Sequence, residues 1–346
     1  MKKFWLLIAF IISLNAKVYE FIDQANNPVS IVVPVKKMVV MQHHSFDILA
    51  QLKALDLVVA TEKNIVKDLG EYIKTIVKNI DNLPKVGDLV TYNIEEIAKL
   101  KPDIVIAASQ ANKEQLIQLN NLGIKTAVIS LRSEGLQKEA QNPILKDANK
   151  AYTDGLYEAL EILSTLSGKE KVAKEIADFI KESRSYVKSH LNAIKDEDRI
   201  KVFVANEGYK TYGNDKYVGV QLLNAGAINV AAKLIQGYKP YTYEMLASLN
   251  PDVIIVQDRY KNVYDEIKQS AQYKNLKAYK DNKIILAPYW TKPWGNPSTD
   301  SFALGELWLA YKFYPNLVSK DYVLKRAKEF YKRFYGIDFN EKDFEY

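Results

Sequence analysis

Two stretches of the chain share one pattern. Residues 92–106 read YNIEEIAKLKPDIVI, and residues 241–255 read YTYEMLASLNPDVII. In each copy a polar residue can cap a short amphipathic helix, because its side-chain oxygen accepts a backbone N–H of the first turn. A proline then ends the helix, and the apolar run after it is typical of a strand buried on both faces. A repeat this far apart indicates domain duplication rather than a solenoid, so two similar α/β lobes are predicted.

Length and composition agree with two lobes that each have a core. The chain has 346 residues, 48% of them hydrophobic and 26% charged, which is ordinary for a globular protein of this size. The formal net charge of +6 is small, and no dense basic stripe with interleaved aromatic residues occurs, so nucleic-acid binding is not expected. Because there is no cysteine, the chain can form no disulfide and carry no lipid on cysteine.

The first 16 residues have the pattern of a secretory signal peptide. Lys2 and Lys3 form a positive start, residues 4–14 form an apolar core, and Ala16 is a candidate cleavage position. The apolar run is too short to span a bilayer, which favours a cleavable signal over a membrane anchor. No later stretch is long and apolar enough to be transmembrane. A soluble periplasmic protein is therefore predicted.

The predicted first lobe covers residues 17–168, in which strands and helices alternate as in a parallel α/β domain. It is expected to begin with a hairpin that turns at residues 26–28. A helix is expected from about Phe46, after the polar residues 42–45. Further short strands are expected at residues 37–41, 57–60, 104–107 and 126–129.

The middle of the chain is predicted to be helical, and the order of elements then repeats. Residues 145–197 contain no strand signal, and Val172, Ile176 and Phe179 have helical spacing. Residues 169–197 are therefore predicted to form a stiff connecting helix. The second lobe is assigned to residues 198–346. Its expected elements are a strand at 200–205, a polar loop at 206–214, a helix at 218–225, the second repeat, a strand at 283–287, and helices at 299–313 and 319–334.

This organisation resembles the substrate-binding components of ABC importers whose two α/β lobes are joined by one long rigid helix. The resemblance is carried by both repeats, by VGD at residues 86–88, by KPWGNPS at 292–298 and by LWLAYKFYP at 307–315. It covers essentially the whole mature chain. It implies two Rossmann-like lobes with parallel sheets, a ligand between them, and a small hinge motion. The family includes proteins that bind ferric siderophores, haem, vitamin B12 and metal chelates.

The resemblance also implies a docking surface for the membrane permease. In this family one exposed glutamate per lobe meets arginines of the permease, and Glu95 and Glu244 are the matching positions. Both acids also suit the positive first turn of a helix. The docking role therefore rests on the resemblance and the duplication.

Two of the three histidines are adjacent and indicate a place for the ligand. His43 and His44 directly follow the first strand of the first lobe, which places them at the lip of the expected cleft, whereas His190 is expected on the surface. Imidazole suits nickel, copper, zinc and iron, so the pair predicts contact with a metal or a metal chelate. Adjacent histidines rarely share one ion, and no third histidine or cysteine is near. A metal that arrives already chelated therefore fits better than an all-protein zinc site.

Aromatic loop residues of the second lobe can form walls for a chelate with little loss of entropy. They are Tyr209, Tyr212, Trp290 and Trp294, of which the two tryptophans are the strongest pair because a proline-rich loop holds them. An arginine can also pair with carboxylates of an anionic chelate. The remaining ligand candidates are Tyr92, Ser109, Gln110, Arg132, Asn206, Glu207 and Arg259.

The predicted function is a monomeric periplasmic receptor that delivers an iron–siderophore or other metal chelate to an ABC importer permease. Nickel bound to a small chelator such as histidine is the main alternative, and no permanent cofactor is expected. Haem, vitamin B12 and a molybdate-type oxyanion rank lower; an oxyanion needs converging arginines or backbone donors, which the sequence does not locate. A zinc- or manganese-binding relative is disfavoured by the scarcity of histidine. An enzyme is disfavoured because no nucleophile elbow, phosphate-binding glycine loop or His-Glu-x-x-His helix occurs.

Overall fold

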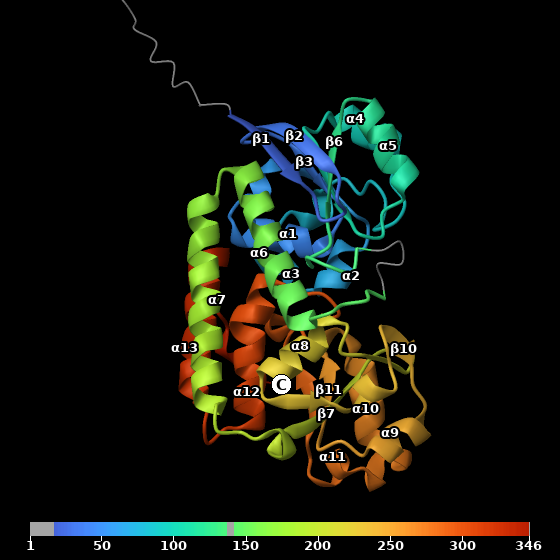
Figure 1. Cartoon of the computed structure of the whole chain (residues 1–346), viewed down its shortest axis with the longest axis vertical. Helices are drawn as coiled ribbons and strands as arrows, with labels where there is room; N and C mark the ends of the chain where they lie inside the picture. Colours follow the sequence, from blue (N-terminus) through green and yellow to red (C-terminus); the bar gives the residue numbers. More distant parts are fainter. Residues whose placement is uncertain (1–16, 137–141, 346) are drawn as a thin grey trace, which may run out of the picture.

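The computed structural model describes residues 17–136 and 142–345, and two lobes lie one above the other along its longest axis (Figure 1). The predicted signal peptide, residues 1–16, lies outside the described residues. None of the described helices is long and apolar enough to cross a membrane.

The first lobe is built on a parallel sheet with strand order β4-β3-β5-β6. These strands are short and almost wholly buried, which explains their continuous apolar sequences. An antiparallel hairpin of β1 and β2 precedes the sheet, as predicted. The elements are β1 (Lys17–Ile22), β2 (Pro28–Val33), β3 (Met38–Val40), α1 (His43–Gln51), β4 (Val58–Thr61), α2 (Ile65–Leu69), α3 (Ile73–Ile76), α4 (Ile94–Leu100), β5 (Ile104–Ala108), α5 (Lys113–Asn121) and β6 (Lys125–Ile129).

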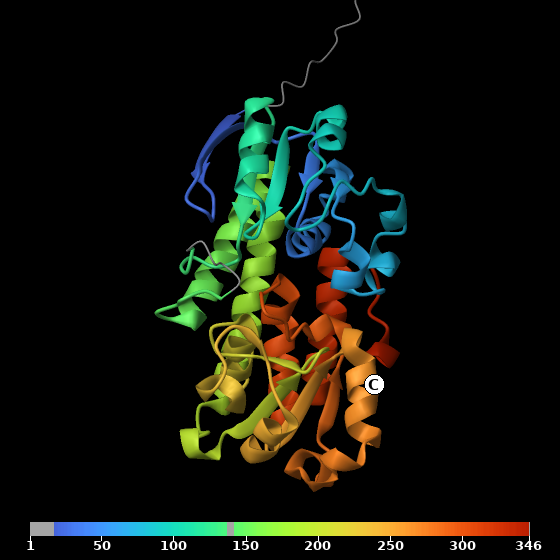
Figure 2. The ribbon, with the colours of Figure 1, turned by 90° about the vertical axis from the view of Figure 1, so that its right-hand side faces the viewer.

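The second lobe has a second parallel sheet, with strand order β12-β11-β7-β9, and a small antiparallel pair of β8 and β10. Helices lie on both sides of the four-stranded sheet (Figures 1 and 2). The elements are β7 (Ile200–Ala205), β8 (Lys210–Tyr212), α8 (Tyr217–Asn224), β9 (Ala227–Asn229), β10 (Tyr238–Pro240), α9 (Tyr243–Leu249), β11 (Val253–Gln257), α10 (Lys261–Gln269), α11 (Lys277–Lys280), β12 (Ile284–Ala287), α12 (Glu306–Phe313) and α13 (Lys320–Phe330).

One long helix, α7 (Glu170–Leu191), runs from the first lobe to the second (Figures 1 and 2). It follows α6 (Ala148–Ser167), which ends at Gly168 in the left-handed conformation that glycine adopts readily. The apolar face of α7 is buried as predicted. Helix α13 packs along it. Arg326 of α13 donates a hydrogen bond to the Phe179 carbonyl, and its guanidinium lies 3.4 Å from the centre of the Phe179 ring.

Two local predictions were wrong. Helix α1 begins at His43 rather than near Phe46, so both histidines lie in its first turn. The polar residues 42–45 predicted a loop, but most of them are buried. The Ser45 hydroxyl donates to Gln42 Oε1, and the side chain of Asp47 is fully buried. The expected polar loop of residues 206–214 contains strand β8, which pairs with β10. Strand β8 has only three residues, two of them polar, so it shows no clear apolar pattern.

Candidate functional site

The two histidines of α1 face an aromatic residue from the second lobe. The His44 ring lies 5.6 Å from the Trp294 ring, centre to centre and nearly perpendicular, and the His43 ring lies 6.3 Å from it. His44 is 4% exposed, and among the described residues neither of its ring nitrogens has a hydrogen-bond partner. The buried indole N–H of Trp294 also lacks a partner there. Buried polar atoms are normally satisfied, so these atoms indicate a place for a polar ligand.

Both imidazoles are held neutral. Burial lowers the pKa of His43 to about 3 and that of His44 well below its usual value, and the positive charges of Arg259 and Lys292 act in the same direction. A neutral imidazole presents one N–H donor and one nitrogen acceptor. The pair can therefore donate hydrogen bonds to an anion or bind a metal through a lone pair.

Arg132 is a buried cation at the end of β6. It is 1% exposed, and its Nη2 has no hydrogen-bond partner within the described ranges. The turn that carries it has Leu131 at φ +61°, held because the Ser130 and Leu131 N–H groups donate to the buried Gln24 side chain at 2.9 and 2.8 Å. Gly155 of α6 allows this approach, since a Cβ there would lie 2.1 Å from the Arg132 Cα.

Lys216 interacts electrostatically with both Arg132 and His44. This lysine precedes α8 and is 4% exposed; burial and the charge of Arg132 lower its pKa to about 8. Its charge in turn contributes to lowering the pKa of His44. A Cβ on Gly295 would come within 3.0 Å of the Lys216 Cε, so the glycine next to Trp294 lets the lysine approach this loop.

Arg259 adds a third cation from the turn after β11. Its guanidinium lies 4.7 Å from the centre of the Trp294 ring, a cation–π distance. Its Nε donates to Gln257 at 2.8 Å, and the Gln257 amide donates to Asn206 at 2.6 Å. Its Nη1 donates to the Asp68 carbonyl of α2 at 2.9 Å, so this arginine also contacts the first lobe. Burial raises the pKa of the Tyr212 phenol, and the phenol lies close enough to Arg259 for that charge to act against the rise.

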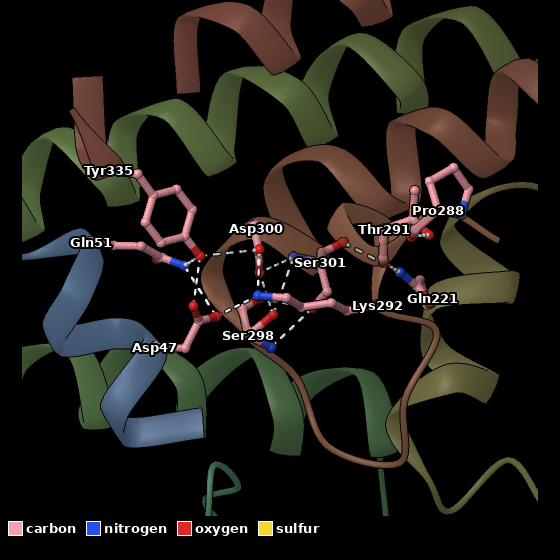
Figure 3. A network of polar contacts seen from close by, with 10 residues as sticks. All are labelled: Asp47, Gln51, Gln221, Pro288, Thr291, Lys292, Ser298, Asp300, Ser301 and Tyr335. Carbon is pink, nitrogen blue, oxygen red and sulfur yellow. Dashed lines mark hydrogen bonds and ion pairs between the residues drawn. The ribbon is translucent and has the colours of Figure 1, made fainter. Parts of the chain in front are cut away.

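A buried ion network holds the Trp294 loop against α1 (Figure 3). Lys292 forms ion pairs with Asp47 of α1 and Asp300, and all three side chains are fully buried. Tyr335, near the C-terminus, donates its hydroxyl to Asp47 at 2.7 Å and accepts from Gln51 at 2.7 Å. Although burial opposes its charge, Asp300 and Asp47 raise the pKa of Lys292. The network therefore positions Trp294 relative to the histidines.

Other predicted ligand residues lie elsewhere. Trp290 is in the core of the second lobe: its indole N–H donates to the Asp343 carbonyl at 2.9 Å, and its ring stacks on Phe344. Glu207 is exposed, and the exposed Tyr209 donates its hydroxyl to Glu266. Tyr92 is packed in the core beside β5, and Ser109 and Gln110 contact each other after that strand. Among the described residues, no hydrogen bond, ion pair or ring contact joins these side chains to the cluster around Trp294.

The two docking candidates are exposed in the first turns of α4 and α9, which lie toward opposite ends of the molecule (Figure 1). Glu244 also accepts hydrogen bonds from its own backbone N–H and from Thr242, which lower its pKa. Lys216, Lys292 and Asp47 were not predicted as site residues. Lys292 lies in the quoted KPWGNPS stretch, but nothing local shows that its charge is buried.

The cluster can bind a small anion. Arg259 lies over the Trp294 ring, and the charges of Arg259 and Lys216 act on the neutral His44, while the charge of Arg132 acts on Lys216. No side chain caps the first turn of α1, and the positive end of a helix attracts anions. Asp47 and Asp300 both form ion pairs with Lys292, so they are already engaged. The arrangement thus offers directed donors and positive charge in a buried place.

The chain has two α/β lobes with parallel sheets, one long helix that joins them, and a buried polar cluster where they meet. This arrangement defines a two-lobed solute-binding protein. A protein-family model described as periplasmic binding protein matches residues 38–289, and the chain belongs to this family. Membership confirms the predicted fold and the predicted class, a periplasmic binding protein of ABC transporters rather than an enzyme.

Several relatives are named for different ligands. The molybdate-binding protein MolA of Haemophilus influenzae is 35% identical over 314 residues, 90% of each chain. The Fe(3+)-citrate-binding protein YfmC of Bacillus subtilis is 27% identical over 273 residues, 78% of each chain. The structure of MolA bound to molybdate has a TM-score of 0.89 at 33% identity, over 93% of this chain and 99% of that one. Helicobacter pylori CeuE with nickel and histidine has a TM-score of 0.71 at 17% identity, over 94% and 98%, which shows a shared fold.

Proposed function

We propose that this protein captures a tetrahedral oxyanion of the molybdate type between its lobes and delivers it to an ABC importer. The observation that carries the proposal is Arg132, a buried guanidinium whose Nη2 lacks a partner in the described part of the chain. Its Nε and Nη1 donate to the Gly135 and Ser130 carbonyls, each at 3.4 Å, and a bound anion would stabilise this buried charge further. The similarity to MolA supports the same ligand class.

The donors suit an oxyanion better than a bulky siderophore. Arg132 and Arg259 provide guanidinium N–H groups, which match oxyanion oxygens in pairs. His44 and Trp294 add neutral N–H groups that orient the ligand. The aromatic walls first expected for a chelate are not all present here, because Trp290 lies in the core and Tyr209 is exposed.

A small metal chelate remains the second candidate. The observation in its favour is the neutral state of His43 and His44, because a deprotonated imidazole nitrogen is a metal ligand. Nickel with free histidine and ferric citrate are the probes for this alternative. Each would use an imidazole as a direct ligand, whereas molybdate would use it as a hydrogen-bond donor.

Thermal unfolding with a ligand panel separates the candidates. Molybdate at ~100 times its dissociation constant should stabilise the fold by about 2.7 kcal/mol. Arg132→Gln should abolish that shift without lowering the stability of the ligand-free protein, because it removes a buried cation that forms no ion pair with a described carboxylate. Arg333→Gln, which alters an exposed arginine that pairs with Glu329, is the control. A shift with nickel–histidine or ferric citrate alone, or an unchanged molybdate shift in Arg132→Gln, would contradict the oxyanion proposal.

Export and docking complete the proposed function. Residues 1–16 are proposed to direct export, and Glu95 and Glu244 are proposed to dock on the permease, since both are exposed in corresponding first turns. Charges at such positions set register and association rate. Reversing both to arginine should stop uptake by cells while molybdate binding by the purified protein stays intact. Normal uptake by this double variant would remove the docking role.

A further inference from the structure

A second group of ligand-type side chains lies in the first lobe beside the anion cluster, and His43 belongs to both. His43, Glu62 and Asp68 each place one ligand atom so that the three atoms lie within 4.8 Å of one another. His43 Nδ1 and Asp68 Oδ2 are 3.6 Å apart. This grouping combines one imidazole and two carboxylates, which are ligand types of transition metals.

The sheet topology explains why these residues meet. His43 begins the helix that follows β3, and Glu62 directly follows β4. These strands are neighbours and run parallel, so their carboxyl ends lie at the same edge of the sheet. Helix α2 follows at once and brings Asp68 back to that edge. The position is therefore set by regular elements of one lobe and does not depend on the second.

Unsatisfied atoms point into this group. Glu62 is fully buried, and its Oε1 has no hydrogen-bond partner among the described residues, while Oε2 accepts from the Asn64 N–H at 2.5 Å. The buried His43 Nδ1 also lacks a hydrogen-bond partner there. An unpaired buried carboxylate oxygen beside an unpaired imidazole nitrogen is costly unless something binds both.

We propose that His43, Glu62 and Asp68 form a binding site for a divalent first-row transition-metal ion. Metal–nitrogen and metal–oxygen bonds are about 2.0–2.2 Å, so donors on one ion lie at most about 4.4 Å apart. The observed spacing meets this limit after small side-chain rotations. Three protein ligands leave coordination positions open for water. The mixed nitrogen and oxygen set favours ions such as Mn²⁺, Co²⁺ or Zn²⁺ over Ca²⁺, which takes six to eight oxygens.

Arg259 opposes this ion. Its guanidinium donates to the Asp68 carbonyl at 2.9 Å, so a positive charge from the second lobe lies next to the proposed site. The same arginine belongs to the proposed oxyanion site. The two ligands are therefore expected to respond in opposite directions to its removal.

The test uses Co²⁺, whose visible absorption reports its ligands, added to protein freed of metal with a chelator. One equivalent should bind. Glu62→Gln and Asp68→Asn should each weaken binding by at least the roughly 10–100-fold that loss of even an outer-shell partner causes. Glu71→Gln, which alters an exposed acid just after α2, is the matched control and should change nothing. Arg259→Gln should tighten Co²⁺ binding while weakening molybdate binding.

Three results would overturn the site. They are the absence of stoichiometric Co²⁺ binding, binding by Glu62→Gln and Asp68→Asn as tight as by the unchanged protein, and competition by Ca²⁺ as strong as by Zn²⁺. Asp68 is only partly buried, so its variant reports on the site even where Glu62→Gln unfolds. His43→Gln adds an independent readout, since loss of a nitrogen ligand shifts the Co²⁺ spectrum. Molybdate binding is measured in parallel and does not depend on Glu62, so failure of one proposal is distinguishable from failure of the other.

Discussion

The two copies of the repeated helix–strand unit have nearly the same hydrogen bonds. Asn93 Oδ1 accepts from the Glu96 N–H, and Thr242 Oγ1 accepts from the Met245 N–H, both at 3.2 Å. Both helices end in a left-handed residue, at Lys101 and Asn250.

The aspartate after each proline also has the same role in both lobes. Asp103 Oδ2 accepts from the Lys37 N–H, and Asp252 Oδ2 accepts from the Lys201 N–H, each at 2.9 Å. Each aspartate thereby ties its strand to the start of the neighbouring strand. The duplicated motif is thus a structural unit, and its matched residues stabilise the sheet edge away from the ligand.

The lobes differ at the opposite edge, where the ligand would bind. In the first lobe β3 leads directly into α1, whose residues His44, Asp47 and Gln51 are polar and buried. In the second lobe β7 leads into strand β8. The polar donors of this lobe instead come from Arg259, after β11, and from the loop that carries Trp294. The two lobes thus share a scaffold, while each has its own functional groups.

The largest expected effect comes from breaking the contact between these unlike edges. Lys292→Met leaves Asp47 and Asp300 buried without their cation, so we expect a loss of about 3–5 kcal/mol of unfolding free energy at neutral pH. Chemical denaturation measures it. Lys150→Met, at an exposed ion pair, is the control and should change stability by less than about 1 kcal/mol. A loss below about 1 kcal/mol in Lys292→Met would show that the network does not hold the lobes together.

A smaller effect should appear in the pH dependence of the site. The pKa of Lys216 is lowered to about 8, so this lysine loses its charge as the pH rises through that value. Molybdate affinity should therefore be constant below pH 8 and fall by up to about tenfold per unit above it. Between about pH 8 and the usual pKa of lysine, the unfolded chain keeps the Lys216 proton while the folded chain does not. The unfolding free energy of the unliganded protein should therefore rise with pH over this range.

Lys216→Met is the companion variant for this experiment. It should bind molybdate more weakly and lose the decline above pH 8, which calorimetric titration at several pH values can measure. An unchanged decline in this variant would assign the titration to another group.

The smallest expected effects test the likeness of the two repeats. Asn93→Ala and Thr242→Ala should each lower stability by about 1 kcal/mol, because each removes the acceptor for one first-turn N–H. Replacement of either residue by serine should restore most of the loss. Clearly unequal losses would mean that the two caps, despite equal distances, do not contribute equally.

Much of the scaffold could be predicted from sequence because its signals are local. Caps, prolines, buried apolar runs and helical spacing lie within a few residues of one another, and they located β3, β5, β7, β11 and the long helix α7. Strands β9 and β10 were missed because each has only three residues and neither is a continuous apolar run like β3. The start of α1 was misplaced because buried polar residues resemble a loop.

The site was less predictable because its signals are tertiary. His43 and His44 stood out through the rarity of histidine, and Arg132 and Arg259 appeared only as lesser candidates. Trp290 and Trp294 lie in one loop and looked equivalent, yet one packs against Phe344 and the other faces His44. The burial of Lys292 depends on Asp47, which lies far away in the sequence, and no local pattern reports it.

The hydrogen bond between Gln51 and Tyr335 joins residues 284 positions apart. Contacts of such long sequence separation form late, because the entropy of closing the intervening chain must be overcome first. Gln51 and Asp47 thus meet Tyr335 and Lys292 only after the second lobe has been made. Two buried polar groups of the first lobe are therefore satisfied by the second lobe rather than by their own.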